Sequence, residues 1–439
     1  MTEAVTPAPS RSLFGSVVDI RAGEMRALVL SFVFFFSVLC SYYIVRPLRD
    51  EMAVSLGGDF IQQSFLIVFV VMLAAVPVFG WIVAHTPRRL IVPVVYGVFV
   101  LCLAAFWLIH LRGKPGPLEA SIFYIFVNIF ALFTVSLFWS AMSDAWTTEQ
   151  AKRLFGVISL GGTGGALAGP LLIQGLIGLI GADHLFLVSI LFLVVALVAS
   201  LFLREALGRE PGSAGERPEG GSVLAGAINV WKSPYLFRIA IWIFAVNMIG
   251  IFFYLEQARI LGALLPEREA RIIFLARMET ATSALTILFE AFVTARLLKG
   301  LGAGRTLAIA PAFVALALAA LLLIPSLWVI AAIMVASRAI GYGISNPAIR
   351  VLYTVVDPQD KYRAQNFIDT LVHRGGNAAS SWLFNAGAKA AGIAAPVIAA
   401  SAIPLAILWV WLSLDLGRRQ EEASEKAEAA AESGRSGPD

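Results

Sequence analysis

Twelve apolar segments, each about 20 residues long, follow one another along this chain of 439 residues. An α-helix rises about 1.5 Å per residue, so about 20 residues are needed to cross the hydrocarbon core of a bilayer. Soluble domains contain about 25% charged residues, whereas this chain contains 14% and has a mean hydropathy of +0.82. We therefore predict an all-α integral membrane protein with twelve transmembrane helices. Their expected cores are residues 27–48, 60–84, 90–110, 120–143, 156–180, 182–203, 236–262, 271–298, 304–325, 326–349, 366–391 and 394–415.

Polar stretches divide these segments into two groups of six. A stretch rich in Gly, Pro, Glu and Ser, residues 204–235, separates an expected bundle over 27–203 from a second one over 236–417. Such a composition is typical of a flexible linker. Polar tails are expected at residues 1–26 and 418–439, and the second tail is either a solvated helix or disordered.

The loops between the segments differ in positive charge. Those on the side of the N-terminus carry most of the Lys and Arg residues, and the opposite loops carry only Arg112, Lys114, Arg268 and Arg271. Because loops rich in Lys and Arg stay in the cytoplasm, both termini and the linker are predicted to be cytoplasmic.

The two halves contain matching motifs. Residues 149–165 align with residues 360–376, and residues 42–46 align with residues 252–256 at nearly the same offset. Chance similarity between apolar helices is the alternative to an internal repeat. Two pseudo-symmetric six-helix bundles joined by a cytoplasmic linker resemble the major facilitator fold, in which two halves move around a site at mid-membrane.

Small residues in the fifth segment predict close packing of helices. Gly165 and Gly169 are four residues apart, so they lie on one helix face and allow a neighbouring helix to approach. The glycine-rich run around them lacks the lysine and hydroxyl residue of a phosphate-binding loop. We therefore expect a packing role.

Charged residues inside the apolar segments are the main clue to function. Arg46, Arg49 and Asp50 are spaced i, i+3, i+4 and share one face of the first helix. A charge near the membrane centre costs roughly 3 kcal/mol, so such residues usually face a cavity. Arginine binds phosphate or carboxylate bidentately and stays charged, and we predict that Arg49 and Arg374, one from each half, hold an anionic substrate. The predicted substrate-binding residues are Arg46, Arg49, Asn128, Glu256 and Arg374.

A second set of buried polar residues is assigned to gating or proton coupling. Asp50 and Glu256 would pair with the arginines when substrate is absent, and only His373 among the histidines is deep enough to carry a proton. The alternative is ion pairing without ligand binding, as between Glu256 and Arg259. The predicted gating or coupling residues are Asp50, Asp144, Arg259, Arg277, Glu279, Arg338, Asp369 and His373.

Four short elements resemble one transporter family. Residues 43–50 resemble the first-helix element of the ATP/ADP translocases, the nucleotide transporters of obligate intracellular bacteria and plastids. Residues 149–156 resemble that family's loop after helix 4, residues 254–256 its helix 7 element and residues 373–376 its helix 11 element.

The resemblance implies that two basic residues and two glutamates are central to nucleotide transport. Arg49 and Arg374 stand where the family has lysines, Glu256 matches one glutamate, and the uncharged Asn128 stands near the place of the other. It also implies a multi-pass protein of the bacterial inner (plasma) membrane.

These observations predict a secondary active transporter that moves an anionic solute, such as a nucleotide or another phosphate-bearing molecule, by alternating access. The alternatives are a proton-coupled exporter of drugs or amphiphiles, and a membrane scaffold or receptor that does not transport. No catalytic or metal-ligand pattern is present, so neither an enzyme nor a cofactor is expected. The expected partners are a small anionic solute, with ATP and ADP as candidates, and membrane lipid, without nucleic acid and without a second subunit.

Overall fold

The protein is described by a computed structural model, which covers residues 20–21, 23–113, 115–207, 223–387, 392 and 395–435. Across these residues the chain is helical and contains no β-strand. The longer elements are α1 (Met25–His85), α2 (Arg88–Leu111), α3 (Pro117–Ala145), α4 (Thr148–Ile180), α5 (Leu185–Leu207), α6 (Val223–Lys232), α7 (Pro234–Leu264), α8 (Arg268–Leu288), α9 (Thr294–Leu323), α10 (Leu327–Ile340), α11 (Asn346–Leu352), α12 (Pro358–Phe367), α13 (His373–Ser381) and α15 (Ala395–Arg435). Short π-helical or 3₁₀ segments, η2 (Phe289–Val293), η3 (Gly341–Ser345), η4 (Tyr353–Val355), η5 (Ile368–Val372) and η6 (Trp382–Gly387), connect some of them.

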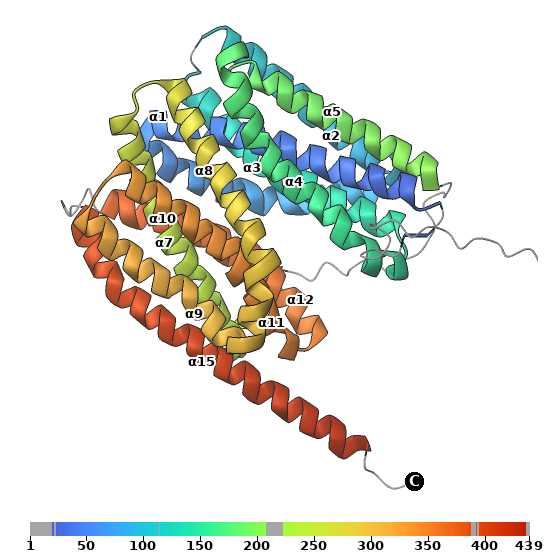
Figure 1. Ribbon diagram of the computed structural model, residues 1–439, viewed down its shortest axis with the longest axis vertical. Helices are drawn as coiled ribbons and strands as arrows, with labels where there is room; N and C mark the ends of the chain where they lie inside the picture. Colours follow the sequence, from blue (N-terminus) through green and yellow to red (C-terminus); the bar gives the residue numbers. More distant parts are fainter. Residues whose placement is uncertain are drawn as a thin grey trace, which may run out of the picture.

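The helices form two bundles. Figure 1 shows α2 to α5 packed with α1 in one bundle and α7 to α15 in the other. The apolar core has two parts, one centred on the first bundle, with residues such as Phe34 and Phe138, and one on the second, with residues such as Leu318 and Ile330. Each part extends across the interface between the bundles. The all-α, two-bundle fold predicted from the sequence is confirmed.

Part of the difference between the number of helices and the number of predicted spans has a local reason. Eight helices in the described part of the chain are long and apolar enough to cross a membrane. Two of these runs contain a glycine with positive φ, Gly57 (φ 81°) in α1 and Gly302 (φ 76°) in α9, where the chain turns into a second helix. Only glycine adopts this backbone conformation without strain. Each of these runs therefore contains two of the predicted segments.

The predicted close packing at Gly165 and Gly169 is confirmed. A Cβ at Gly165 would lie 2.1 Å from the backbone oxygen of Phe36, and one at Gly169 would lie 2.9 Å from that of Cys40, both on α1. On α13, Gly376 faces α7 less tightly: a Cβ there would lie 3.2 Å from the ring of Phe244 and 3.5 Å from the side chain of Asn247. Matching glycines thus face matching helices, α1 and α7, as the internal repeat requires.

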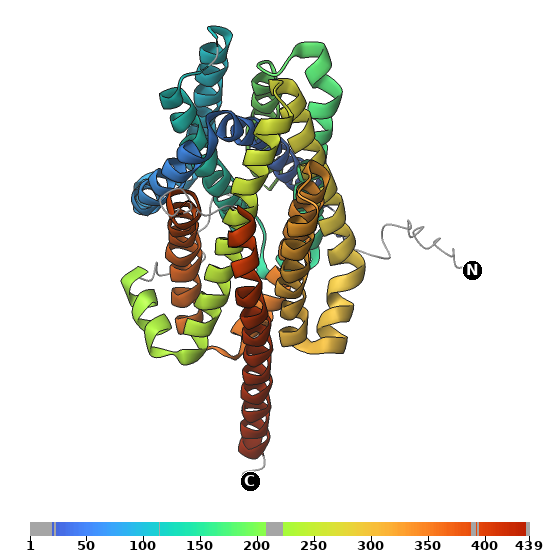
Figure 2. The same cartoon turned by 90° about the vertical axis from the view of Figure 1, so that its left-hand side faces the viewer.

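Both the linker, which was expected to be flexible, and the C-terminal tail contain helix in the described part of the chain. The second half of the expected linker forms α6, which packs against α12, and residues 208–222 lie outside the described part of the chain. At the other end, α15 continues to Arg435, so the tail is a helix as far as the structure describes it. Figure 2 shows this last part of α15 extending beyond both bundles.

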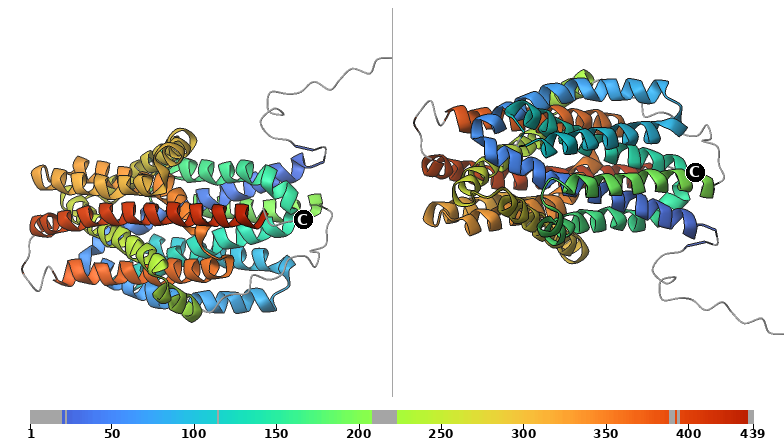
Figure 3. Two further views of the ribbon diagram at one scale, coloured as in Figure 1. Left: turned by 90° about the horizontal axis from the view of Figure 1, so that it is seen from below. Right: turned by 90° about the horizontal axis from the view of Figure 1, so that it is seen from above.

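The helices of both bundles run in the same general direction (Figure 3). Figures 1 and 3 also show that α1 begins and α15 ends on the same side of the molecule. We call this the terminal side and the other the far side. The loop between α7 and α8 lies on the far side, because α7 runs away from the terminal side.

Candidate functional site

A cavity of about 270 Å³ lies between the two bundles at mid-depth. We call it the central cavity. Both bundles contribute polar side chains to its wall, so it lies where the two bundles meet. These side chains are Arg46, Arg49, Asp50, Tyr124 and Asn128 from the first bundle, and Tyr254, Gln257, Glu279, Ser337, Arg338, Tyr342 and Asn377 from the second.

One glutamate in this cavity holds two arginines from different bundles. Glu279 of α8 forms a bidentate ion pair with Arg338 of α10, at 2.6 and 2.8 Å. Its Oε2 also lies 3.3 Å from Nη1 of Arg46 on α1. The side chain of Glu279 is 4% exposed, so both interactions are shielded from water. Glu279 therefore links the two bundles at the wall of the cavity.

A second pair of charges lies beside the first on α1. Arg49 donates from Nε and Nη2 to Oδ1 of Asp50, at 3.0 and 2.7 Å, and its guanidinium lies over the ring of Tyr124. The hydroxyl of Tyr254 on α7 donates to the same Asp50 oxygen at 3.1 Å. Asn128 lines the cavity one turn along α3 from Tyr124 and donates to its carbonyl oxygen. This group of contacts also crosses between bundles.

The charges at the cavity do not balance. We call Arg46, Arg49, Asp50, Glu279 and Arg338 the central cluster; it has three arginines and two carboxylates, so one positive charge is left. In addition, Nε of Arg46 is buried and has no hydrogen-bond partner among the residues that the structure describes. A buried charge without a counter-charge is costly, and an anion in the cavity would remove that cost.

A second charged group closes the far side. Glu51, one residue after Asp50 and 3% exposed, pairs with Arg271 at 2.7 Å and with Arg268 at 3.4 Å, both on α8. Arg268 also pairs with Asp183 at 2.8 Å. We call these four residues the outer cluster. It joins the bundles with two positive and two negative charges.

Further contacts close the same side. Arg271 donates to Ser55 and to the backbone oxygens of Leu265 and Pro266. Asn385, near the end of the helix that includes α13, donates to Asp59 and Gln62 of the first bundle, at 2.8 and 2.7 Å. The bundles are thus held together on the far side.

Several predicted site residues lie elsewhere. Glu256 is buried but pairs with the exposed Arg259 one turn along α7, and neither lines the central cavity. This is the ion pair that the sequence offered as the alternative to ligand binding. Asp50, in contrast, lines the central cavity, where it pairs with Arg49, its neighbour on α1.

Arg374 and His373 do not join the central cluster either. Arg374 is half-buried on α13, within electrostatic range of Tyr42, and is absent from the wall of the cavity. The arginine that the second bundle contributes is Arg338 instead. His373 lines a different chamber, described below, and the side chain of Asp369 lies outside the described part of the structure.

The two remaining predicted residues are exposed. Arg277 of α8 is two residues from Glu279, so the helix points it away from the cavity. Asp144 lies in the last turn of α3, near Arg204. Neither is placed with the central cluster.

Glu51, Tyr124 and Tyr254 contribute to the site but were not among the site residues predicted from the sequence. Glu51 belongs to the same charged run as Asp50, and one residue turns a helix by about 100°, so the two carboxylates face different partners. Arg268 and Arg271 were noted as rare positive charges on the far side, which was the available signal for a partner of Glu51. Tyr254 lies in the element 254–256 that resembles the ATP/ADP translocases, but only Glu256 of that element was predicted as a site residue. For Tyr124 the sequence gives no signal that separates it from other aromatic residues of the helices.

The Major Facilitator Superfamily model matches residues 30–381. The chain belongs to the major facilitator superfamily. The predicted fold is confirmed, and the fold and family indicate a transporter and not an enzyme. No curated protein sequence matches the chain.

Solved structures with the same fold are distant in sequence. A bacterial homologue of the iron transporter ferroportin, in its inward-facing state, is 15% identical with a TM-score of 0.60, covering 90% of this chain and 100% of that one. A point mutant of the nucleoside transporter NupG is 14% identical with a TM-score of 0.59, covering 91% and 99%. A bacterial homologue of the human lysosomal transporter Spinster, inward-facing and unoccupied, is 16% identical with a TM-score of 0.54, covering 91% and 94%. At these identities they show the fold alone, and the resemblance to ATP/ADP translocases stays a prediction.

Proposed function

We propose that this member of the major facilitator superfamily is a secondary active transporter that moves an organic anion across the bacterial inner membrane by alternating access. The observation that carries the proposal is the surplus positive charge of the central cluster. An anion binding beside Arg46 would supply the missing counter-charge and a partner for its free Nε. A cation would add to the surplus, so the charge balance disfavours it.

The same residues suggest how substrate binding is coupled to movement. Arg46 and Glu279 belong to different bundles and are in contact across the cavity. An anion on Arg46 and Arg49 competes with Glu279 and Asp50 for the guanidinium groups. Binding therefore weakens the contacts between bundles at mid-depth, which frees the halves to rock.

The direction of opening follows from the outer cluster. Its ion pairs hold the far side closed, and the loops rich in Lys and Arg support a cytoplasmic location for the terminal side. The proposed state is therefore one in which the far, periplasmic side is shut. Release of the outer cluster would open the other route.

Transport by purified protein in proteoliposomes tests the proposal. Labelled ATP and ADP come first because residues 43–50 resemble the ATP/ADP translocases, followed by other organic phosphates and carboxylates. The variants Arg49→Gln and Arg46→Gln should lose transport of the active solute at least about tenfold, because each removes a charge-assisted contact worth about 1.5–3 kcal/mol.

Arg277→Gln is the matched control, since it removes an arginine from α8 that faces away from the cavity. It should transport like the parent protein. Equal transport by all three variants would contradict the assignment of the cavity. Transport of neutral or cationic amphiphiles, driven by a proton gradient, would favour a proton-coupled exporter over an anion transporter.

A further inference from the structure

A second and larger chamber, of about 600 Å³, opens inside the C-terminal bundle. It adjoins the central cavity, because Ser337, Arg338, Tyr342 and Asn377 line both. Its back wall is different: Phe313 and Val314 of α9 and Trp409 of α15 line it, and these helices contribute nothing to the central cavity. We call it the side chamber.

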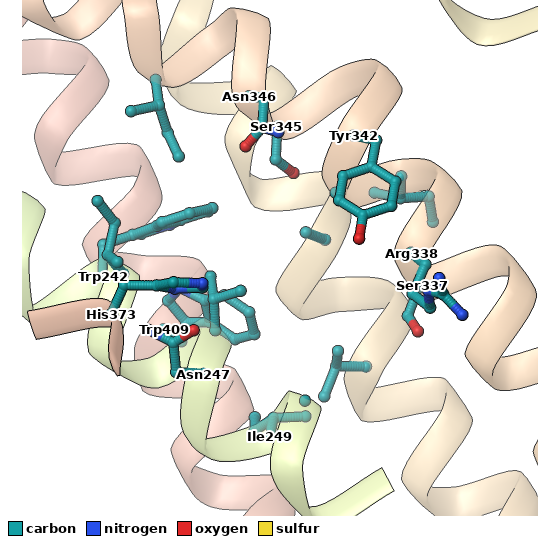
Figure 4. A pocket seen from close by; sticks show the side chains of 18 of the residues that line it. Trp242, Asn247, Ile249, Ser337, Arg338, Tyr342, Ser345, Asn346, His373 and Trp409 are labelled. Atoms are coloured by element: carbon teal, nitrogen blue, oxygen red, sulfur yellow. The ribbon is translucent and has the colours of Figure 1, made fainter. Parts of the chain in front are cut away.

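The side chamber contains hydrogen-bond donors without partners. Nδ2 of Asn247 and Nε1 of Trp409 are buried N–H donors with no hydrogen bond in the described structure, and Oγ of Ser345 is also unpaired. Asn247 is 4% exposed and Trp409 is 5% exposed. Figure 4 shows Asn247, Trp409 and His373 close together on one wall, across the chamber from Arg338 and Tyr342. Unpaired buried donors are rare in proteins and cost about 1–3 kcal/mol each.

The charge of the wall is also one-sided. Two arginines line the chamber, Arg338, which already pairs with Glu279, and Arg350. The described side chains that line it include no Asp or Glu. Arg350 is exposed and makes no ion pair with another described residue. Most of the remaining wall is apolar, with Ile243 and Phe313 as examples. Apolar walls with a few convergent polar groups are typical of small-molecule sites of about 300–1,000 Å³.

The backbone beside the chamber is irregular. The wall includes Gly341, Tyr342 and Ser345 of η3, a π-helical segment in the middle of the helix formed by α10 and α11. Segments of this kind occur frequently at functional sites. At Gly341 a Cβ would meet no atom within 4 Å, so the chamber is open there.

We propose that the side chamber is a second binding site, for an amphiphilic organic anion whose apolar body lies against α9 and α15 and whose acceptor oxygens accept hydrogen bonds from Asn247 and Trp409. Three observations converge on this ligand: unpaired donors, a positive wall and an apolar back wall. The proposal rests on the proposed function and extends it by placing a second anion site next to the central one, and its test separates the two.

The test uses naphthalene-2-carboxylate as the probe and isothermal titration of the purified full-length protein. The neutral naphthalene-2-carboxamide and inorganic phosphate serve as comparison probes. The carboxylate should bind more tightly than the amide, because it supplies a charge to Arg350 and stronger acceptors to both donors. Trp409→Phe and Asn247→Leu, which remove one donor each, should weaken carboxylate binding about tenfold.

Gly341→Leu should abolish binding, because the leucine side chain would occupy the chamber. Its Cβ would not clash with the protein, since no described atom lies within 4 Å of that position. Gly175→Leu, at an exposed glycine of α4 that also has open space, is its control and should bind like the parent. Arg49→Gln should keep the probe affinity even where it stops transport. The proposal is overturned if the parent does not bind the carboxylate, if Gly341→Leu binds it unchanged, or if Arg49→Gln loses it as Gly341→Leu does.

Discussion

The central and outer clusters share one arrangement of charges at two depths but differ in net charge. In each, one buried glutamate contacts two arginines and links the bundles: Glu279 with Arg46 and Arg338, and Glu51 with Arg268 and Arg271. The outer cluster also includes Asp183 and is neutral. The central cluster keeps one positive charge beside a cavity.

The difference separates closing a path from binding a ligand. A neutral network whose donors also have backbone and hydroxyl partners, such as Arg271, needs nothing further to be stable. A network with a surplus charge and an unpaired Arg46 Nε is incomplete until an anion arrives. The outer cluster on the far side is therefore stable without a ligand, whereas the central cluster at mid-depth keeps a positive charge that an anion can neutralise.

The largest expected effect is that of Glu279→Gln. Removing the carboxylate leaves Arg46 and Arg338 buried without their shared partner, and breaking a buried ion pair in this way costs about 3–5 kcal/mol. Thermal unfolding in detergent should show this loss of stability. An organic anion at saturating concentration should restore part of it, by occupying the place of the carboxylate.

The outer cluster provides the comparison for this experiment. Glu51→Gln should destabilise the protein less, because Arg268 keeps Asp183 and Arg271 keeps Ser55 and two carbonyl oxygens. An equal loss of stability in the two variants, or rescue of Glu51→Gln by the same anion, would remove the distinction between the clusters.

Glu51→Gln should instead change the balance between conformations. Hydrogen bonds to charged groups contribute about 1.5–3 kcal/mol, so weakening these contacts should raise the population open on the far side by about tenfold. Spin labels at Leu118, at the start of α3, and Leu264, at the end of α7, report on the separation of the bundles there, and both positions are exposed. A larger fraction of long distances is the expected result.

Glu24→Gln is the matched control for this measurement. Glu24 also pairs with an arginine, Arg153, but both residues belong to the first bundle. Its removal should leave the distance distribution on the far side unchanged. A similar shift in both variants would mean that loss of any carboxylate loosens the fold.

Much of the fold was predictable because it depends on local properties of the sequence. The length of the apolar segments determines which parts can cross a bilayer, and Gly165 and Gly169 indicate a close helix contact from their spacing alone. The presence of Arg46 and Arg49 at the cavity follows from the cost of charge in lipid. Each of these inferences depends on the sequence of a single helix and not on how two helices pack.

The partners of those residues were less predictable because they depend on the rotation of one helix against another. Glu256 and Glu279 are both glutamates within apolar helices, yet only Glu279 faces the cavity, and Arg338 rather than Arg374 meets it. Two residues along α8 separate Glu279 from the outward-facing Arg277. Packing between the bundles determines the orientation of these side chains. This packing cannot be inferred from a single sequence.

The smallest expected effect comes from a third glutamate–arginine contact, on the terminal side. Burial raises the pKa of Glu24, but hydrogen bonds from Arg153, Gln150 and the backbone N–H of Arg21 outweigh it and lower the pKa from 4.5 to about 2. A carboxyl group whose pKa is lower in the folded state stabilises the fold above its unfolded pKa, and this stability is lost as the pH falls through the folded value. Parent protein and Glu24→Gln should therefore differ in unfolding temperature at neutral pH and converge between pH 4.5 and about 2. A difference that stays constant over this window would show that Glu24 acts by packing and not by its charge.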